Sequence, residues 1–159
     1  MEDLSPLDAG FLDAEDADKH ASLAIASVVI VAGPPPSQDE FIEAVRARLA
    51  LVPRYRHRVR TVPLDLGRPV WVDSPQFDLA YHVRRTALPA PGDDAALCRL
   101  VGRVMSQRLD RDRPLWECWV VEGLAGGRWA VLVKVHHCMV DGVAGNQLLG
   151  VLFDDAPKP

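Results

Sequence analysis

The spacing of apolar residues divides the first third of the chain into a strand and a helix. Residues 22–32 form a β-branched, almost wholly apolar run that ends at GPPPS, as expected for a buried strand terminated by a loop. Ser37 and Glu40 then have the spacing of a capping box, which marks the start of a helix. Apolar residues follow at helical intervals: Phe41, Ile42, Val45, Leu49 and Val52. We therefore predict a helix that begins after Ser37 and ends before Pro53.

The second half of the chain continues this alternation of helix and strand. A helix is expected after PAPGDD, with an apolar face made of Leu97, Leu100, Val101, Val104, Met105 and Leu109. Two strand-like runs, residues 115–124 and 128–137, are separated by an Ala-Gly-Gly turn and predict a β-hairpin. Apolar residues between 143 and 152 predict a further helix. The pattern indicates a domain of the α/β or α+β class.

Arginines alternate with other residues between positions 54 and 60. The side chains that would share one face of an extended segment are Arg54, Arg56, Arg58 and Arg60. We interpret this face as solvated, with a site for a phosphorylated ligand as the alternative. The sequence PVWVD, residues 69–73, predicts the next strand, which a turn around Leu66 and Gly67 would join to the first.

Composition and charge narrow the class of protein. The 159 residues are 48% apolar, which is enough for one domain with a continuous core. The formal net charge of −4 argues against nucleic-acid binding, which usually needs a basic domain. Cys98, Cys118 and Cys138 form no C-x-x-C pair, so a reduced, cytoplasmic compartment fits better than a disulfide framework. No apolar run approaches the roughly 20 residues that cross a bilayer, and the acidic beginning does not resemble a signal peptide.

Two adjacent histidines end the second strand of the predicted hairpin. In a strand that continues through both, His137 shares a face with Val133 and Val135, and His136 shares the opposite face with Lys134. Strand neighbours rarely bind one ion, so no metal site is predicted. One imidazole is suited to act as a general base, because burial lowers the pKa of a histidine and keeps it neutral near pH 7. A buried histidine pair without a catalytic role is the alternative.

The residues after the histidines would form a corner between strand and helix. Asp141 can cap the following helix or pair with an arginine, and Gly142 gives the backbone freedom to turn. Cys138 would face away from His137, which disfavours a Cys–His nucleophilic pair and favours a small core residue. The glycines of the hairpin turn lack the lysine of a P-loop, so no phosphate-binding loop is expected.

The sequence HHCMVDG, residues 136–142, matches the HHxxxDG signature of the CoA-dependent acyltransferase superfamily. Three further stretches narrow the resemblance: LSPLDAGFL at residues 4–12, RDRPLWE with Pro114, Leu115 and Trp116, and FDLAYHVRRTALPAPG at residues 77–92. Over residues 4–153 the chain resembles the bacterial wax ester synthase/diacylglycerol acyltransferase family. The resemblance implies one half of a two-domain, chloramphenicol acetyltransferase-like fold, in which a mixed sheet is flanked by helices.

The same resemblance implies a reaction and its substrates. His137 would take the proton from the hydroxyl of a diacylglycerol or a long-chain alcohol while that oxygen attacks the thioester of a fatty acyl-CoA, the co-substrate. His136 would support His137, Asp141 would hold the corner, and no separate cofactor is implied. The Pro-Leu-Trp segment would shape the acyl or acceptor channel, with simple packing as the alternative.

Members of this family are longer than this chain and have two similar halves with an active-site tunnel between them. We therefore expect residues 1–153 to be the N-terminal acyltransferase half-domain and residues 154–159 to begin an interdomain linker. The partner would be the complementary C-terminal half, in cis or as a separate chain, or a second copy bound through an exposed apolar face. Without a partner we expect the chain to be inactive. The alternatives are a truncated, non-catalytic module that binds lipid or a partner, and a condensation-type acyltransferase. The expected location is the cytoplasm, including the surface of membranes or lipid droplets.

Overall fold

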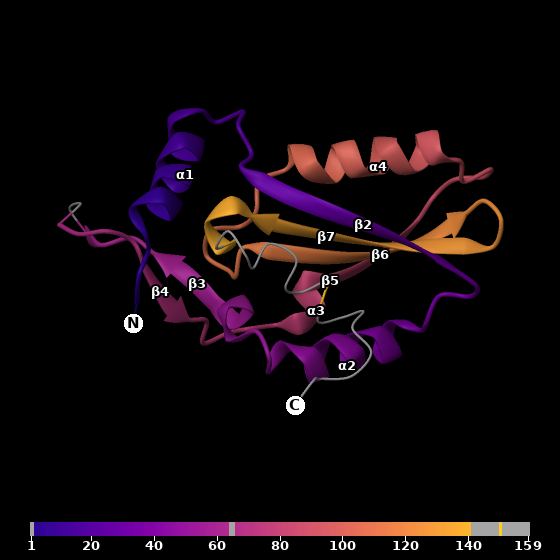
Figure 1. Cartoon of the computed structure of the whole chain (residues 1–159), viewed down its shortest axis with the longest axis horizontal. Helices are drawn as coiled ribbons and strands as arrows, with labels where there is room; N and C mark the ends of the chain where they lie inside the picture. Colours follow the sequence, from indigo (N-terminus) through magenta and orange to yellow (C-terminus); the bar gives the residue numbers. More distant parts are fainter. Residues whose placement is uncertain (1, 64–65, 141–149, 151–159) are drawn as a thin grey trace.

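A four-stranded sheet with a helix on each face forms the centre of the protein (Figure 1). The computed structural model describes residues 2–63, 66–140 and 150. The strand order is β2-β7-β6-β5, with bounds β2 (Ala24–Ala32), β7 (Arg128–His136), β6 (Trp116–Leu124) and β5 (Val83–Ala87). Strand β5 runs parallel to β6, whereas the other pairs are antiparallel. The sheet is therefore mixed, and the predicted fold class is confirmed.

The four α-helices that the described residues form begin at side-chain caps, as the sequence predicted for the helix that follows Ser37. Their bounds are α1 (Pro6–Ala17), α2 (Gln38–Leu49), α3 (Leu79–His82) and α4 (Asp94–Ser106). The capping box of α2 is present: Ser37 Oγ accepts the Glu40 N–H at 3.3 Å, and Glu40 Oε2 accepts the Ser37 N–H at 2.8 Å. Helices α2 and α4 lie on opposite sides of the four-stranded sheet (Figure 1). Within the described ranges, no helix is both long enough and apolar enough to cross a membrane.

The acidic beginning of the chain also forms a helix, α1, which the sequence pattern did not predict. Ser5 caps it by accepting the Asp8 N–H at 3.1 Å. The buried face of α1 contains Leu12, but it also contains the carboxylates of Asp8 and Glu15. These charges interrupt the apolar periodicity by which the other helices can be recognised.

Alternate side chains of β7 pack toward the helices on opposite faces of the sheet. The side chains that share a core with Phe41 and Val45 of α2 are Trp129, Val131, Val133 and Val135. Ala130 packs with Leu97 of α4 in a second cluster. The alternation expected along this strand is therefore confirmed up to His136. The predicted hairpin of β6 and β7 is also present, and the turn residues Gly126 and Gly127 have φ angles of 78° and 64°, which glycine adopts without strain.

A smaller sheet of strand order β1-β4-β3 lies beside the first (Figure 1). Its strands are β1 (Glu2–Asp3), β4 (Val70–Asp73) and β3 (His57–Arg60). Strands β3 and β4 pair in antiparallel register, as predicted for the Arg-rich segment and PVWVD. The pair contributes Val59 and Trp71 to the main core, so the two sheets share one hydrophobic interior.

The prediction of an extended segment from Arg54 to Arg60 was wrong for its first half. Pro53–Arg56 form a 3-10 helix, η1, because proline favours the first turn of a helix and Tyr55 is buried in the core. Arg54 instead pairs with Glu2 at 2.8 Å on the edge of the small sheet. The four arginines therefore do not form one face.

Candidate active site

The two adjacent histidines lie where β7 ends and the 3-10 turn η3 (His137–Met139) begins. Their backbone amides donate to segments on opposite sides of β7. The His136 N–H donates to the Leu115 carbonyl at 2.9 Å, and the His137 N–H donates to the Leu23 carbonyl at 2.8 Å. Leu115 immediately precedes β6, and Leu23 immediately precedes β2. The backbone is thus held at both histidines by neighbours that are distant in sequence.

His136 is buried, with only 1% of its surface exposed. Its Nδ1 accepts the Cys138 N–H at 3.1 Å, so the proton of the neutral ring lies on Nε2, which is 3.5 Å from Oε2 of Glu15. Burial, partly offset by the charge of Glu15, lowers the pKa of His136 to about 4. Because its unprotonated nitrogen is already bonded, this ring is suited to a supporting role and not to accepting a substrate proton.

His137 has the more accessible ring of the two. The residue is half-buried, and its ring stacks on Phe11 of α1, with 4.5 Å between the ring centroids and 30° between the planes. Within the described part of the chain, no hydrogen bond engages its ring nitrogens. An unprotonated ring nitrogen of His137 is therefore available to accept a proton from a ligand.

Both imidazoles contact helix α1, one turn apart. Phe11 stacks on His137, and Glu15, four residues later, lies beside His136. The expectation that the two rings would turn to opposite faces of the sheet was wrong for His137, because β7 ends at His136 and η3 redirects the next residue. The helix that supports the pair is the one that the apolar pattern did not reveal.

Glu15 and two arginines attach α1 to the loop between α4 and β6. Glu15 Oε1 accepts the Leu23 N–H at 3.0 Å, and Oε2 lies 2.6 Å from Nη2 of Arg111. Arg108 Nε donates to the Ala21 carbonyl at 2.8 Å, and its Nη2 donates to the Glu15 carbonyl. Burial alone would raise the pKa of Glu15, but the Leu23 N–H and Arg111 outweigh it and lower the pKa, so the carboxylate is ionised at neutral pH.

Sequence reasoning did not find the residues that surround the histidines. Arg111 and Glu15 are 96 positions apart, so only folding reveals that they meet. One local signal was available. Glu15 follows Leu12 by three positions, and an acidic residue on the apolar face of a helix is usually buried only when it is paired.

Cys138 is a core residue, in line with its interpretation from the sequence. It is 2% exposed, and burial raises the pKa of its thiol to about 12, so the thiol is protonated at neutral pH. In residues 2–63, 66–140 and 150, no three His, Cys, Asp or Glu side chains are grouped to hold a metal ion.

The Pro-Leu-Trp segment lies in the core beside the histidines. Pro114, Leu115 and Trp116 are all buried. Trp116 Nε1 donates to the Tyr55 carbonyl at 2.8 Å, and its ring stacks on His82 with 4.6 Å between centroids. Packing therefore accounts for the segment in this chain, and a contribution to a substrate channel stays a prediction.

Other predicted features lie outside the described residues. These are Asp141, Gly142, the helix expected between residues 143 and 152 apart from Gly150, and the linker expected at residues 154–159. The corner after the histidines is therefore described only as far as Val140, whose N–H donates to the His137 carbonyl at 3.1 Å.

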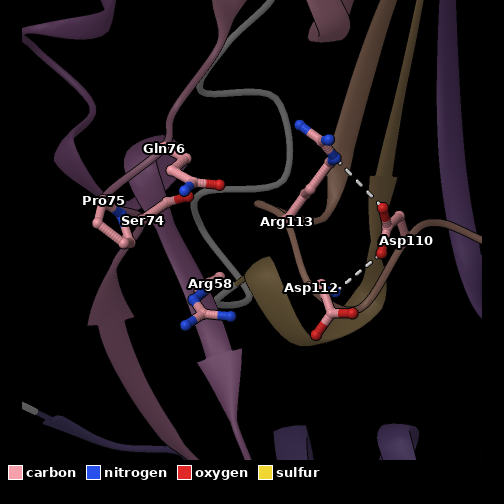
Figure 2. Close-up of a pocket in the computed structure, with 7 residues that line it drawn as sticks. All are labelled: Arg58, Ser74, Pro75, Gln76, Asp110, Asp112 and Arg113. Carbon is pink, nitrogen blue, oxygen red and sulfur yellow. Dashed lines mark hydrogen bonds and ion pairs between the residues drawn. The ribbon is translucent and has the colours of Figure 1, made fainter.

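A cavity of about 420 Å³ lies between the small sheet and the loop before β6 (Figure 2). Its lining residues are Arg58, Ser74, Pro75, Gln76, Asp110, Asp112 and Arg113. Figure 2 shows Asp110 between Arg113, at 3.3 Å, and the N–H of Asp112, at 2.9 Å. Two arginines thus face two aspartates, and this balance does not favour the phosphorylated ligand considered for the arginine-rich segment.

Comparisons with known proteins agree with the resemblance carried by the sequence motifs. The family model of the wax ester synthase/diacylglycerol acyltransferase catalytic domain matches residues 4–159. A probable diacylglycerol O-acyltransferase of Mycobacterium tuberculosis H37Rv is 51% identical over 156 residues, which cover 98% of this chain and 34% of that protein. A putative diacylglycerol O-acyltransferase of the same strain is 46% identical over 156 residues, 98% of this chain and 33% of that one. The chain spans about a third of the length of the curated relatives it matches.

Solved structures support the same conclusion. The wax ester synthase/diacylglycerol acyltransferase from Marinobacter aquaeolei VT8 is 32% identical with a TM-score of 0.73, over 91% of this chain and 36% of that one. The first condensation domain of the calcium-dependent antibiotic synthetase has a TM-score of 0.77 at 20% identity, over 95% of this chain and 36% of that one, and shares the fold. With the family model matching nearly the whole chain, this protein belongs to the wax ester synthase/diacylglycerol acyltransferase family.

Proposed function

We propose that this chain carries the histidine-bearing part of an acyl-CoA-dependent O-acyltransferase that forms triacylglycerol or wax esters. The observation that supports this proposal is the difference between the two histidines of the motif. His136 is buried with its Nδ1 bonded to the Cys138 N–H, whereas His137 is half-buried with no hydrogen bond to its ring in the described chain. The names of the relatives give the reaction class, diacylglycerol O-acyltransferase or wax ester synthase.

The proposed reaction needs one base and no covalent acyl-enzyme. His137 takes the proton from the hydroxyl of a diacylglycerol or long-chain alcohol as the oxygen attacks the thioester carbonyl of a fatty acyl-CoA. The tetrahedral intermediate collapses to the ester as the carbon–sulfur bond breaks. The CoA thiolate receives the proton from the imidazolium, which restores the base. His136 supports His137, and Asp141 and Gly142 complete the corner.

A complementary half, in cis or as a separate chain, completes the site in this proposal. The chain spans about a third of its relatives, and His137 is only half-buried among the described residues. A base that is open to water loses the positioning and water exclusion on which catalysis depends. Because the acceptor is a lipid, we also propose that the assembled enzyme works at the surface of membranes or lipid droplets.

The test compares His137→Ala with His136→Asn and His20→Ala in a preparation that contains the complementary half. Released CoA thiol and newly formed ester are measured with a long-chain acyl-CoA and diacylglycerol or hexadecanol. His137→Ala should lower kcat by about 100-fold or more, the contribution typical of a general base. His136→Asn keeps an acceptor for the Cys138 N–H and should lose less, and His20→Ala, at an exposed position, should match the wild type. Full turnover by His137→Ala would rule out its role.

A further inference from the structure

The carboxylate of Glu15 lies at the centre of the contacts behind the histidine pair. Only 1% of Glu15 is exposed, yet both of its oxygens are engaged. Oε1 accepts the Leu23 N–H at 3.0 Å, and Oε2 lies 2.6 Å from Arg111 Nη2 and 3.5 Å from His136 Nε2. A buried carboxylate with a backbone donor and an arginine is fixed in both position and charge.

Leu23 connects this carboxylate to the backbone of His137. Its N–H donates to Glu15, and its carbonyl accepts the His137 N–H at 2.8 Å. Leu23 lies just before β2, outside the ladder of hydrogen bonds that holds that strand to β7. In the described chain, the side chain that fixes the Leu23 peptide is therefore Glu15, and a displacement of Leu23 would move the amide of His137.

The ring of His137 depends on the same helix. Phe11, one turn before Glu15 on α1, stacks on the imidazole with 4.5 Å between centroids. Glu15 is the side chain of α1 that contacts both Leu23 and Arg111, so it helps to set where Phe11 meets His137. The backbone and the ring of His137 are thus both placed by α1.

We infer that Glu15 is a positioning residue for His137, acting through the Leu23 peptide and through the placement of Phe11. This inference rests on the proposed function only in taking His137 to be the base. Glu15 does not exchange a proton with the substrate. Its contribution is to hold the imidazole of His137 where it can take the proton from the attacking hydroxyl.

A purely structural role for Glu15, as an anchor for Arg111, makes different predictions. Asp16 is the neighbour of Glu15 and also pairs with Arg111, at 3.2 Å, but it is exposed and has no contact with Leu23 or His136 in the described chain. Asp16→Ala is therefore the matched control, because it removes a partner of Arg111 without touching the connection to His137.

The first experiment measures amide hydrogen exchange by NMR in the 159-residue chain, and it needs no activity. Glu15→Ala should speed exchange at Leu23 and His137 by about tenfold or more, as expected on loss of a charge-assisted hydrogen bond. Amides of the β3–β4 pair, which Glu15 does not contact, report whether the fold survives. Asp16→Ala should leave Leu23 and His137 protected. Equal exchange in wild type and Glu15→Ala, or equal loss in Asp16→Ala, overturns the inference.

Glu15→Asp and Glu15→Gln keep the inference testable if Glu15→Ala fails to fold. Aspartate retains the charge but withdraws the oxygen from Leu23, whereas glutamine keeps an oxygen within reach of the Leu23 N–H. We expect faster exchange at Leu23 and His137 in Glu15→Asp and most of the wild-type protection of both amides in Glu15→Gln, because glutamine keeps a hydrogen bond to Leu23 but not its charge. Faster exchange in Glu15→Gln than in Glu15→Asp would show that the negative charge beside Arg111 matters and that the hydrogen bond to Leu23 does not. That result would overturn the inference.

The second experiment measures kcat and KM in the assembled enzyme. Glu15→Asp should lower kcat by about 10- to 100-fold with little change in KM, because a small displacement of a catalytic group costs rate and leaves substrate binding intact. Glu15→Gln should recover most of the kcat, and Asp16→Ala should match the wild type. If His137→Ala is inactive while Glu15→Asp has wild-type kcat, the positioning role fails and the proposed function stands. If His137→Ala is active, the proposed function fails, and amide exchange still decides the role of Glu15.

Discussion

The surroundings of His136 and His137 show how adjacent residues of one type acquire different chemistry. His136 is buried beside Glu15, whereas His137 is half-buried and stacks on Phe11. The sequence predicts one supporting and one working histidine, and this division stays a prediction. The sequence could not show which groups contact the two histidines, because Glu15, Leu23 and Phe11 lie more than 100 residues before the motif.

The lowered pKa of His136 makes the stability of the protein sensitive to acid. The pKa falls from an ordinary 6.5 to about 4 on folding, so the unfolded chain binds the proton more tightly than the folded one. Stability is therefore full above pH 6.5 and falls as the pH drops toward 4. Between pH 7 and 4.5, this single group should cost about 2–3 kcal/mol of the free energy of unfolding.

Denaturation of His136→Asn at pH 7 and pH 4.5 checks this expectation. The variant keeps an acceptor for the Cys138 N–H but does not titrate, so its loss of stability over this range should be smaller than that of the wild type by the same amount. His82 is also buried with a lowered pKa, but it is present in both proteins and cancels in the comparison. Equal losses in the two proteins would contradict the assignment of this acid sensitivity to His136.

At the scale of single elements, the strands and helices with regular apolar periods were predictable. Strand β2, helix α2, helix α4 and the hairpin of β6 and β7 all follow from spacing and local caps. Helix α1 was missed because its buried face includes Asp8 and Glu15. The segment from Arg54 to Arg56 was assigned wrongly because alternation of charge resembles a strand, whereas Pro53 and the buried Tyr55 favour a 3-10 turn.

The capping box of α2 gives a direct test at this scale. Ser37→Ala removes the acceptor of the Glu40 N–H and should lower the free energy of unfolding by about 1 kcal/mol. Ser37→Asp restores an oxygen at the cap and should recover most of that loss. Urea denaturation of the two variants and the wild type measures both values. A Ser37→Ala protein as stable as the wild type would show that packing of α2 alone determines where it begins.

At the scale of the whole molecule, the proposed need for a complementary half has a direct test. The chain alone, the chain mixed with the remainder of the Mycobacterium tuberculosis relative, and that remainder alone are assayed for ester formation. Turnover should arise only in the mixture.

Val28 and Ile30 of β2 are 39% and 46% exposed, so size-exclusion chromatography of the chain alone also tests whether a second copy covers them. A monomeric chain with full activity would contradict the requirement for a second half.

The position of β7 in the sheet has a consequence for how the protein folds during its synthesis on the ribosome. Strand β7 lies between β2 and β6, yet of the four strands that the described residues form in this sheet it is the last in chain order. Until β7 emerges, the edge of β2 that pairs with it has no partner in the sheet. The carbonyls of Leu23 and Leu115 also lack the N–H groups of His137 and His136 that they accept in the folded protein. Such long-range closure is slow and leaves apolar strands open to wrong pairings. The histidine pair therefore emerges at the end of the strand that joins β2 to β6, and a nascent chain that stalls before residue 128 has neither that strand nor the histidines.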